Sequence, residues 1–227
     1  MDFCYQEIAR MIDHSLLRPT MTTAELEAGC SLAMEYDVAS VCIMPYYLRE
    51  CVSILANSEV RPSTTVGFPH GAQTTLCKIA EAEEALSEGV QEIDAVINIS
   101  KALSEDWIYV QNELRVLISL VHQHNKLIKI IFENCYLKEH HKIRLCQICG
   151  ELGADWVKTS TGYGSGGATL EDLALMRKHS PPEVQVKAAG GVRDLDSLLR
   201  VRQLGVTRVG ASATKAILDE CRARLQH

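Results

Sequence analysis

Short β-rich segments alternate with helical segments along the whole sequence, and this alternation constrains the fold more than any other feature. Parallel strands joined by helices form either an open doubly wound sheet or a closed (β/α)8 barrel. Eight evenly spaced strand–helix units favour the barrel. No G-x-G-x-x-G motif follows the first predicted strand, which weakens the dinucleotide-binding alternative. We therefore predict an α/β fold in which residues 1–227 form a single (β/α)8 TIM barrel domain with an extra N-terminal helix.

The predicted strands are short runs of apolar and β-branched residues, and the predicted helices have apolar residues three and four positions apart. The strands are Arg10–Ser15, Val38–Met44, Ser63–Phe68, Gln91–Asn98, Lys126–Phe132, Trp156–Ser160, Val184–Ala188 and Thr207–Ala211. The helices include one from Thr22 or Thr23 to Tyr36, one ending at Gly153, and Tyr47–Ser58, Thr74–Gly89, Ser104–Asn125, Leu170–His179, Leu195–Gly205 and Thr214–Leu225.

The charge and the cysteines exclude several classes of protein. A net charge of -6 argues against a nucleic-acid-binding surface, which needs a basic stripe. No apolar run approaches the roughly 18 residues of a membrane span, and the N-terminus lacks a signal-peptide core. Nine cysteines at irregular spacing indicate reduced thiols and a cytoplasmic protein. The one CxxC, Cys146 and Cys149, lies in a predicted helix without a second pair, so buried thiols are favoured over a zinc site.

Charged residues recur at alternate positions of the predicted strands. Because side chains alternate between the two faces of a strand, the apolar set of each strand is expected to face the helices. The other set then points into the barrel and brings together Asp94, Lys129, Glu133, Lys158 and Lys187, with Cys42 added from the second strand.

Three of these residues lie late in their strands, where the active sites of such barrels are found. They are Asp94, Lys158 and Lys187, whereas Lys129 lies nearer the middle of its strand and is expected to be a deeper ion-pair partner. The competing interpretation is that all of these charges form structural ion pairs. Two lysines on neighbouring strands, each followed by a loop that contains glycine, favour the catalytic interpretation.

The two lysines suggest a way to make an amine nucleophilic at neutral pH. A lysine with a pKa of about 10.4 is almost entirely protonated there. A second ammonium about 5 Å away, at an effective dielectric constant of about 20, disfavours the charged form by roughly 3 kcal/mol. Neighbouring strands are about 4.8 Å apart, so Lys158 and Lys187 can approach this closely. Asp94 is then a candidate proton shuttle. The pattern leaves open which lysine is the nucleophile.

Glycine-containing loops follow the last three predicted strands, at 162–167, 190–191 and 210–212. Phosphate often binds at the loops after the seventh and eighth strands of such barrels. Glycine allows backbone amides to approach a phosphate, and the next helix N-terminus favours its charge. We therefore predict a phosphate site at these loops.

The sequence resembles the deoxyribose-phosphate aldolases, which are class I aldolases with a (β/α)8 fold. The motifs that carry the resemblance span nearly the whole chain in order: IDHSLL (12–17), VCIMP (41–45), VGFPHGA (66–72), EIDAVIN (92–98), VKTSTGYGSGGAT (157–169), VKAAGGVR (186–193) and RVGAS (208–212).

The resemblance implies a role for each candidate residue. Lys158 would form the Schiff base, Lys187 would perturb its pKa, and Asp94 would transfer protons. Asp13 and Lys129 would lie behind Lys158 and Lys187, next to these two side chains but without contacting the substrate. The phosphate and the rest of the substrate would be held by Gly162, Gly190, Gly191, Ser212, Cys42 and Thr159.

The reaction implied is reversible cleavage of 2-deoxy-D-ribose 5-phosphate to D-glyceraldehyde 3-phosphate and acetaldehyde. No metal or other cofactor is expected, because the iminium is the electron sink. The expected partners are therefore a small sugar phosphate and an aldehyde, with neither a nucleic acid nor a membrane, and with a homodimer as the assembly hypothesis.

Two other functions remain open from the sequence. One is another phosphate-binding barrel enzyme, such as a sugar-phosphate isomerase, but that class uses a Glu/His pair and the late-strand candidates include no histidine. The other is a barrel that binds sugar phosphates without catalysis.

Overall fold

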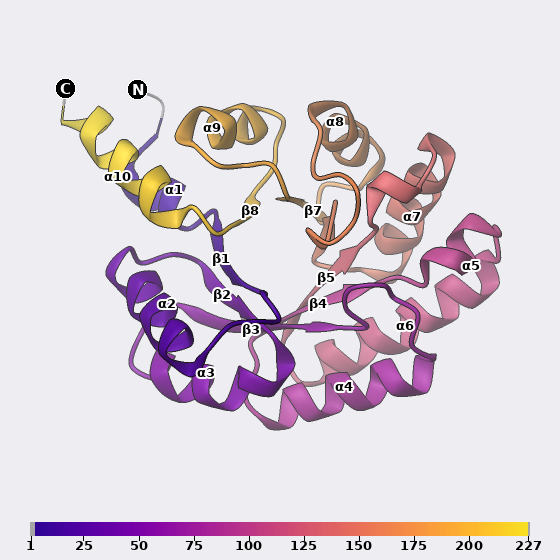
Figure 1. Cartoon of the computed structure of the whole chain (residues 1–227). Helices are drawn as coiled ribbons and strands as arrows, with labels where there is room; N and C mark the ends of the chain where they lie inside the picture. The colour runs from indigo at the N-terminus through magenta and orange to yellow at the C-terminus, as the bar shows by residue number, and fades with distance from the viewer. Residues whose placement is uncertain (1–2, 227) are drawn as a thin grey trace.

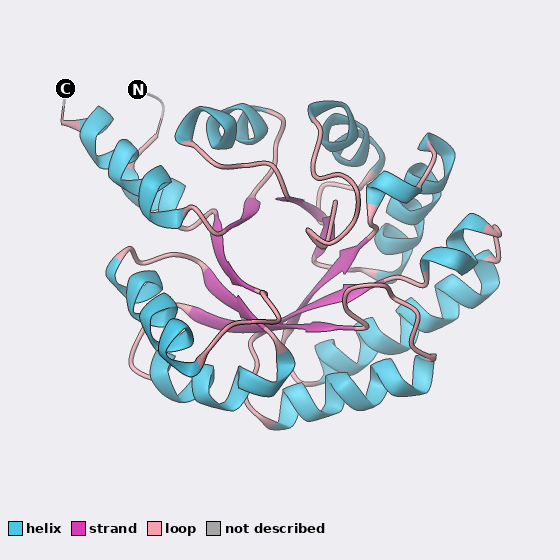
Figure 2. Ribbon diagram, viewed as in Figure 1, coloured by secondary structure: helices cyan, strands magenta, loops and turns pink. Residues whose placement is uncertain are grey.

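Eight parallel strands close into a barrel within residues 3–226, the part of the chain that the computed structural model describes (Figure 1). The strands pair in sequence order, and the last strand pairs with the first, so the sheet has no free edge. Helices surround the strands on the outside (Figure 2). The predicted (β/α)8 fold with an extra N-terminal helix is thereby confirmed.

The strands are β1 (Ile12–Leu16), β2 (Ser40–Ile43), β3 (Arg61–Val66), β4 (Glu92–Val96), β5 (Leu127–Ile131), β6 (Trp156–Lys158), β7 (Gln185–Ala189) and β8 (Arg208–Ala211). The helices are α1 (Tyr5–Ala9), α2 (Thr23–Glu35), α3 (Leu48–Leu55), α4 (Thr75–Ser87), α5 (Ile99–Leu103), α6 (Trp107–Gln123), α7 (Glu139–Leu152), α8 (Leu170–His179), α9 (Leu195–Gln203) and α10 (Thr214–Leu225), with short 3₁₀ turns η1 (Pro45–Tyr47) and η2 (Asn134–Tyr136).

The main hydrophobic core lies between the strands and the ring of helices. Alternate strand residues such as Ile93, Ile130 and Val186 are fully buried in this core. The residues between them point into the barrel, because successive side chains of a strand face opposite ways. The barrel interior is therefore free to hold charged groups.

Several elements begin or end differently from the prediction. The second strand is shorter than predicted and comprises only Ser40–Ile43. The sixth strand ends at Lys158, so this lysine is its last residue. The sequence pattern missed α5, which begins because the Asn98 side chain accepts a hydrogen bond from the Lys101 amide and caps the helix. The Asp106 carboxylate then caps α6 in the same way.

The two ends of the described chain lie side by side, since α1 packs against α10 (Figure 1). Arg222 of α10 lies over the Tyr5 ring, with its guanidinium carbon 4.8 Å from the ring centroid. The same guanidinium donates a hydrogen bond to the Tyr5 hydroxyl. The extra N-terminal helix is thereby fixed beside the start of β1.

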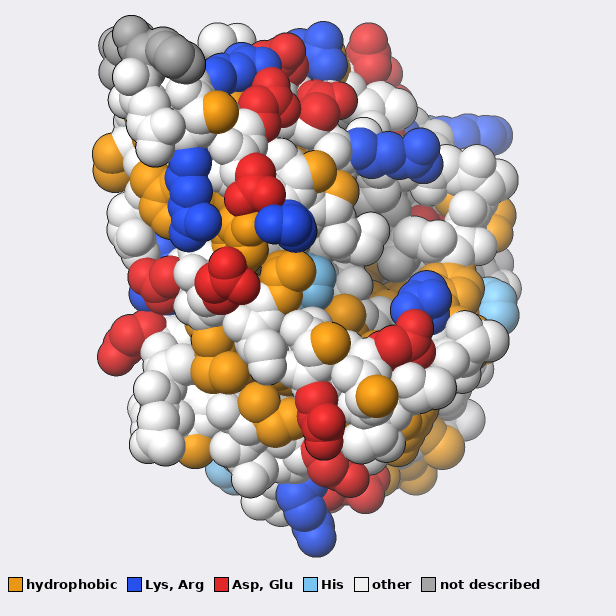
Figure 3. All heavy atoms as spheres, turned by 60° about the vertical axis from the view of Figure 1, so that its left-hand side comes forward, with side chains coloured by type: hydrophobic (Ala, Val, Ile, Leu, Met, Phe, Trp, Pro, Cys, Tyr) orange, Lys and Arg blue, Asp and Glu red, His pale blue; other side chains and the backbone are white. Residues whose placement is uncertain are grey.

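The surface shows no segregation of charge on the face that carries α10, α1 and α2, where basic and acidic side chains are interspersed (Figure 3). None of the described helices has the length and apolarity needed to cross a bilayer.

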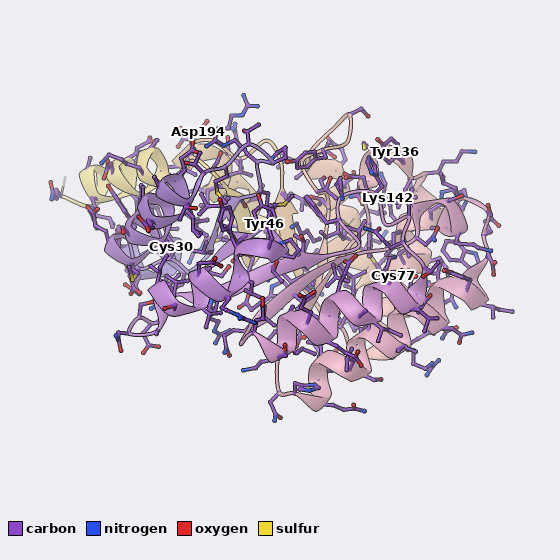
Figure 4. All side chains as sticks on the ribbon, turned by 60° about the horizontal axis from the view of Figure 1, so that its bottom comes forward. Cys30, Tyr46, Cys77, Tyr136, Lys142 and Asp194 are labelled. Carbon is purple, nitrogen blue, oxygen red and sulfur yellow. The ribbon has the colours of Figure 1, made fainter. Side chains whose placement is uncertain are left out.

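All nine cysteines of the sequence lie in the described chain and carry free thiols. They are dispersed over the molecule: Cys30 on α2 is buried, whereas Cys77 on α4 is exposed and lies far from it (Figure 4). Cys146 and Cys149 are fully buried on α7, as predicted. Burial raises the pKa of both thiols, that of Cys146 to about 11, which keeps them protonated and unsuited to zinc.

Candidate active site

A cavity of about 330 Å³ opens at the carboxyl ends of the strands. Lys158 lies in its wall, together with residues from the loops after β1, β6, β7 and β8. This is the end of the barrel at which active sites of this fold are built. The lining residues are Ser15, Leu17, Arg18, Lys158, Thr161, Gly162, Tyr163, Ala189, Gly190, Gly210 and Ser212.

The Lys158 ammonium is almost completely buried and has one carboxylate partner. Its side chain is 3% exposed, and Nζ donates to Asp94 Oδ2 at 2.6 Å. The small exposed fraction belongs to the side that faces the cavity, because Lys158 is in the cavity wall. Lys158 is thus the candidate that is both buried and accessible to a small substrate.

Lys187 lies directly opposite Lys158 on the neighbouring strand and has two carboxylate partners. Its Nζ lies 2.7 Å from Asp94 Oδ2 and 2.5 Å from Asp13 Oδ2. The two lysines therefore share one oxygen of Asp94, and their proximity agrees with the expectation from strand spacing.

The two lysines have opposite pKa shifts, and their partners explain why. Burial and the neighbouring Lys187 ammonium lower the pKa of Lys158, against the opposing effect of Asp94. Burial also disfavours the charge on Lys187, but Asp13 and Asp94 together outweigh it and raise the pKa of Lys187. Lys158 is therefore the amine that loses its proton more readily, a distinction that the sequence pattern could not make.

Lys129 lies deeper in the barrel, as predicted. Its Nζ is 2.7 Å from Asp94 Oδ1 and 2.7 Å from Glu92 Oε2, and its side chain is fully buried. Asp13 lies on the other side, 3.9 Å away. Lys129 thus holds the second oxygen of Asp94 and fixes the orientation of that carboxylate.

Sequence reasoning missed two members of this network, Glu92 and Arg208. Arg208 Nε donates to Asp13 Oδ1 at 2.8 Å, and its Nη2 lies 2.7 Å from Glu92 Oε2. Glu92 has the strand parity of Asp94, and this could have identified it. Within the described residues, this buried network then holds three carboxylates (Asp13, Glu92, Asp94) and four cations (Lys129, Lys158, Lys187, Arg208).

Part of the predicted phosphate site lines the cavity. Gly162 and Gly190 are in its wall with φ of 91° and 77°, a conformation that favours glycine. Ser212 is in the wall just before the N-terminus of α10, where the helix dipole favours an anion. These residues come from three different loops, and the structure brings them to the same cavity as Lys158.

Four predicted residues belong neither to this cavity wall nor to the network of ion pairs. Gly191 lines a separate hollow with Thr169 and Arg200. The Thr159 hydroxyl contacts the Ala189 backbone, donating to its carbonyl at 3.2 Å and accepting a hydrogen bond from its amide at 3.1 Å. Cys42 lies inside the barrel, where burial and the neighbouring Asp94 charge raise the pKa of its thiol and the Lys158 charge opposes them.

Glu133 is the fourth of these residues. It was expected to converge with the lysines, but β5 ends at Ile131 and the strand alternation stops there. Glu133 adopts a positive φ of 58°, and its carboxylate instead accepts a hydrogen bond from the Thr161 amide at 3.2 Å. It supports the loop after β6 rather than the lysine cluster.

Tyr163 was also missed by sequence reasoning. It lines the cavity, and its hydroxyl donates to the Leu17 carbonyl at 2.5 Å. Its ring packs edge-on against Phe68, with the ring centroids 5.4 Å apart. Tyr163 therefore ties the loop after β6 to the loop after β1 across the mouth of the cavity.

Elsewhere in the described chain, Glu105, His140 and His141 lie close enough together to resemble a metal site. His141 Nδ1 accepts a hydrogen bond from the Lys138 amide at 3.1 Å, which places the proton of the neutral ring on Nε2. The nitrogen facing Glu105 is then a donor and not a metal ligand. The cluster is better explained by hydrogen bonding.

Known proteins are similar to this chain along almost its whole length. The model of the DeoC/LacD family aldolases matches residues 8–219. The deoxyribose-phosphate aldolase of Rhodopirellula baltica is 59% identical over 224 residues, which cover 99% of this chain and 93% of that protein.

Solved structures show the same barrel. One from Coccidioides immitis, assigned as a deoxyribose-phosphate aldolase, superposes with a TM-score of 0.92 at 32% identity, covering 96% of this chain and 87% of that chain. A tetrameric deoxyribose phosphate aldolase from Aeropyrum pernix shares the fold with a TM-score of 0.90 at 24% identity, covering 97% of this chain and 93% of that chain.

Proposed function

Because this chain belongs to the DeoC/LacD family of aldolases, we propose that it cleaves 2-deoxy-D-ribose 5-phosphate reversibly through a Schiff base on Lys158. The products are D-glyceraldehyde 3-phosphate and acetaldehyde. The observation that carries the proposal is the contrast between two neighbouring lysines. Lys158 faces the cavity with a lowered pKa, whereas Lys187 is held as an ammonium by two carboxylates.

The first step needs a neutral amine at Lys158. Its proton passes to water or to Asp94, whose Oδ2 already accepts a hydrogen bond from Nζ. The amine then attacks C1 of the open-chain sugar phosphate, and loss of water from the carbinolamine gives an iminium. Lys187 keeps its positive charge nearby and so favours the neutral form of Lys158.

Cleavage breaks the bond between C2 and C3 of the sugar. A base removes the proton of the C3 hydroxyl, the C2–C3 electron pair moves into the iminium, and D-glyceraldehyde 3-phosphate leaves. The enamine that remains is protonated at C2 and hydrolysed, which releases acetaldehyde and the free lysine. Asp94 is the proposed proton carrier, acting directly or through water, because it contacts the reacting nitrogen at 2.6 Å.

The phosphate is proposed to bind at Gly162, Gly190 and Ser212. These residues share the cavity with Lys158, so a sugar phosphate can reach the amine with its aldehyde end while its phosphate lies at the loops. Arg18 also lines this cavity and adds positive charge at its rim.

The isomerase alternative fits the cavity less well. Among the described residues that form its wall, none is a histidine or a glutamate. His14 of β1 has the outward parity, and its Nδ1 lies 2.8 Å from the Thr214 hydroxyl. Burial lowers the pKa of His14 to about 4, as expected for a neutral ring that packs in the core.

An assay of deoxyribose 5-phosphate cleavage, coupled to reduction of the released D-glyceraldehyde 3-phosphate after isomerisation, tests the function. We expect turnover by the unmodified chain. Ser212→Asp should raise the KM about tenfold or more through repulsion of the phosphate, with a smaller effect on kcat. Ser197→Asp, on α9, is the matched control and should leave the KM unchanged. Binding of the sugar phosphate without aldehyde release would contradict the proposal and favour a non-catalytic barrel.

We also propose that residues 1–227 act as one catalytic unit in the cytoplasm, which the nine free thiols support. A homodimer remains the proposed assembly. Leu76 of α4 and Ile108 of α6 are 78% and 77% exposed, and these two helices pack against each other, so exposed apolar side chains on neighbouring helices support this proposal. Sedimentation equilibrium tests this, and a monomer in solution would contradict it.

A further inference from the structure

A second cavity, of about 350 Å³, lies at the N-terminal end of the barrel, opposite the proposed active site. Arg61 and Arg208 are the first residues of β3 and β8, and the other lining residues come immediately before β1, β2 and β3. None of them takes part in the proposed reaction. The wall consists of Arg10, Ala39, Glu59, Arg61 and Arg208, so three of its five residues are arginines.

Hydrogen bonds fix the positions of all three guanidinium groups. Arg10 donates to the Val38 carbonyl at 3.2 Å and lies 2.6 Å from the Asp37 carboxylate. Arg208 is held by two buried carboxylates. Arg61 Nη1 lies 3.1 Å from Glu92 Oε1, while its side chain is 50% exposed. The cavity is therefore lined by positioned donors, of which Arg61 remains largely open to solvent.

The interior charge network that ends at this cavity carries more cations than carboxylates. Glu92 is shared by three cations, because Lys129 and Arg208 contact it as well as Arg61. With Arg61 included, the interior network of the described chain has five cations against three carboxylates. Glu59 adds a carboxylate to the wall, but it is exposed and remains solvated.

We propose that this N-terminal cavity binds a phosphate dianion, either inorganic phosphate or the phosphate group of a small metabolite. Arginine suits this ligand because its planar group donates two parallel hydrogen bonds to phosphate oxygens. Arg61 is the principal anchor, with Arg10 and Arg208 on either side of the cavity.

The N-terminal cavity is linked to the catalytic lysine by a continuous chain of ion pairs. Arg208 contacts Asp13, Asp13 contacts Lys187 at 2.5 Å, and Lys187 and Lys158 share Asp94 Oδ2 at 2.7 and 2.6 Å. An anion that draws hydrogen bonds from Arg208 leaves the negative charge of Asp13 less compensated and adds charge of its own. Both effects favour protonated Lys158, so the anion should inhibit. This coupling rests on the proposed role of Lys158, whereas the binding of phosphate at the N-terminal cavity does not.

Calorimetric titration of the full chain with inorganic phosphate, and separately with glycerol phosphate, tests the binding. We expect two sites in the unmodified protein. Arg61→Gln should weaken the N-terminal site about tenfold or more, and Ser212→Asp should weaken only the site beside Lys158. Arg49→Gln, which replaces an arginine whose side chain is 81% exposed, should retain both sites.

A single site in the unmodified protein that Ser212→Asp removes would overturn the proposal, as would two sites that Arg61→Gln leaves intact. Binding of either inorganic phosphate or glycerol phosphate at the Arg61-dependent site supports the proposal. The compound that binds more tightly identifies the kind of phosphate that the site takes. Failure of the proposed aldolase function would appear separately, as absence of turnover in the cleavage assay.

The coupling is tested by the rate at which acetaldehyde and borohydride modify Lys158. In the Ser212→Asp background, saturating phosphate should slow this reaction about threefold, which corresponds to a rise of about half a unit in the pKa of Lys158. Adding Arg61→Gln should abolish the effect. An unchanged rate with phosphate bound would contradict the coupling.

Discussion

Replacing Lys158 with leucine is expected to lower kcat for deoxyribose 5-phosphate cleavage by at least about 10⁴-fold, because the covalent intermediate can no longer form. None of the other lysines in the described interior can take over. Lys187 is held by two carboxylates with a raised pKa, and Lys129 is fully buried below Asp94. The measurement is kcat in the coupled cleavage assay.

The Lys158→Leu variant should fold normally, which separates loss of chemistry from loss of structure. Without Lys158, the buried network of the described chain has three cations, Lys129, Lys187 and Arg208, against three carboxylates. The thermal midpoint should therefore stay the same or rise, since an excess buried charge has been removed.

The matched control is Lys178→Leu, at an exposed position of α8. It should keep full activity. Substantial turnover by Lys158→Leu would show that the nucleophile is another group.

Replacing Asp94 with asparagine should damage both stability and activity. Asp94 accepts hydrogen bonds from Lys129, Lys158 and Lys187 at 2.6 to 2.7 Å. With the carboxylate gone, four buried cations share two carboxylates, and breaking such pairs destabilises a protein by about 3–5 kcal/mol. Loss of the proton carrier should lower kcat by about 10²–10⁴-fold. Denaturant unfolding and the cleavage assay measure the two effects.

The pH profile tests the electrostatic effect of Asp94 on the pKa of Lys158. The Asp94 charge raises the pKa of Lys158, so its removal should lower that pKa further. The remaining activity of Asp94→Asn should therefore begin to increase at a lower pH than the activity of the unmodified chain. Asp196→Asn, which removes an exposed carboxylate paired with Arg224, is the control and should change neither stability nor the profile appreciably. A profile that moves to higher pH in Asp94→Asn would contradict the proposed electrostatics.

Strand parity predicted much of the site from sequence because it depends only on local geometry. Asp94, Lys158 and Lys187 alternate with apolar residues that pack against the helices, and the structure places all three inside the barrel. The errors at Thr159 and Glu133 arise where this rule no longer applies. β6 ends at Lys158 and β5 ends at Ile131, so strand alternation does not place either residue.

The parts of the site that the sequence did not predict depend on contacts between segments that are distant in sequence. Arg208 reaches Asp13 only because β8 pairs with β1 when the barrel closes. The separation of Gly191 from the cavity and the position of Tyr163 follow from loop conformations that no periodic pattern records. The choice between Lys158 and Lys187 required knowing which carboxylates contact each ammonium.

The most direct test of the Schiff-base assignment is to reduce the enzyme with borohydride in the presence of acetaldehyde and to locate the modification by peptide mass spectrometry. We predict one added ethyl group, about 28 Da, on Lys158, formed more slowly as the pH falls below the pKa of this amine. The adduct on Lys187 or Lys129, or no adduct while cleavage proceeds, would contradict the assignment of Lys158 as the Schiff-base lysine.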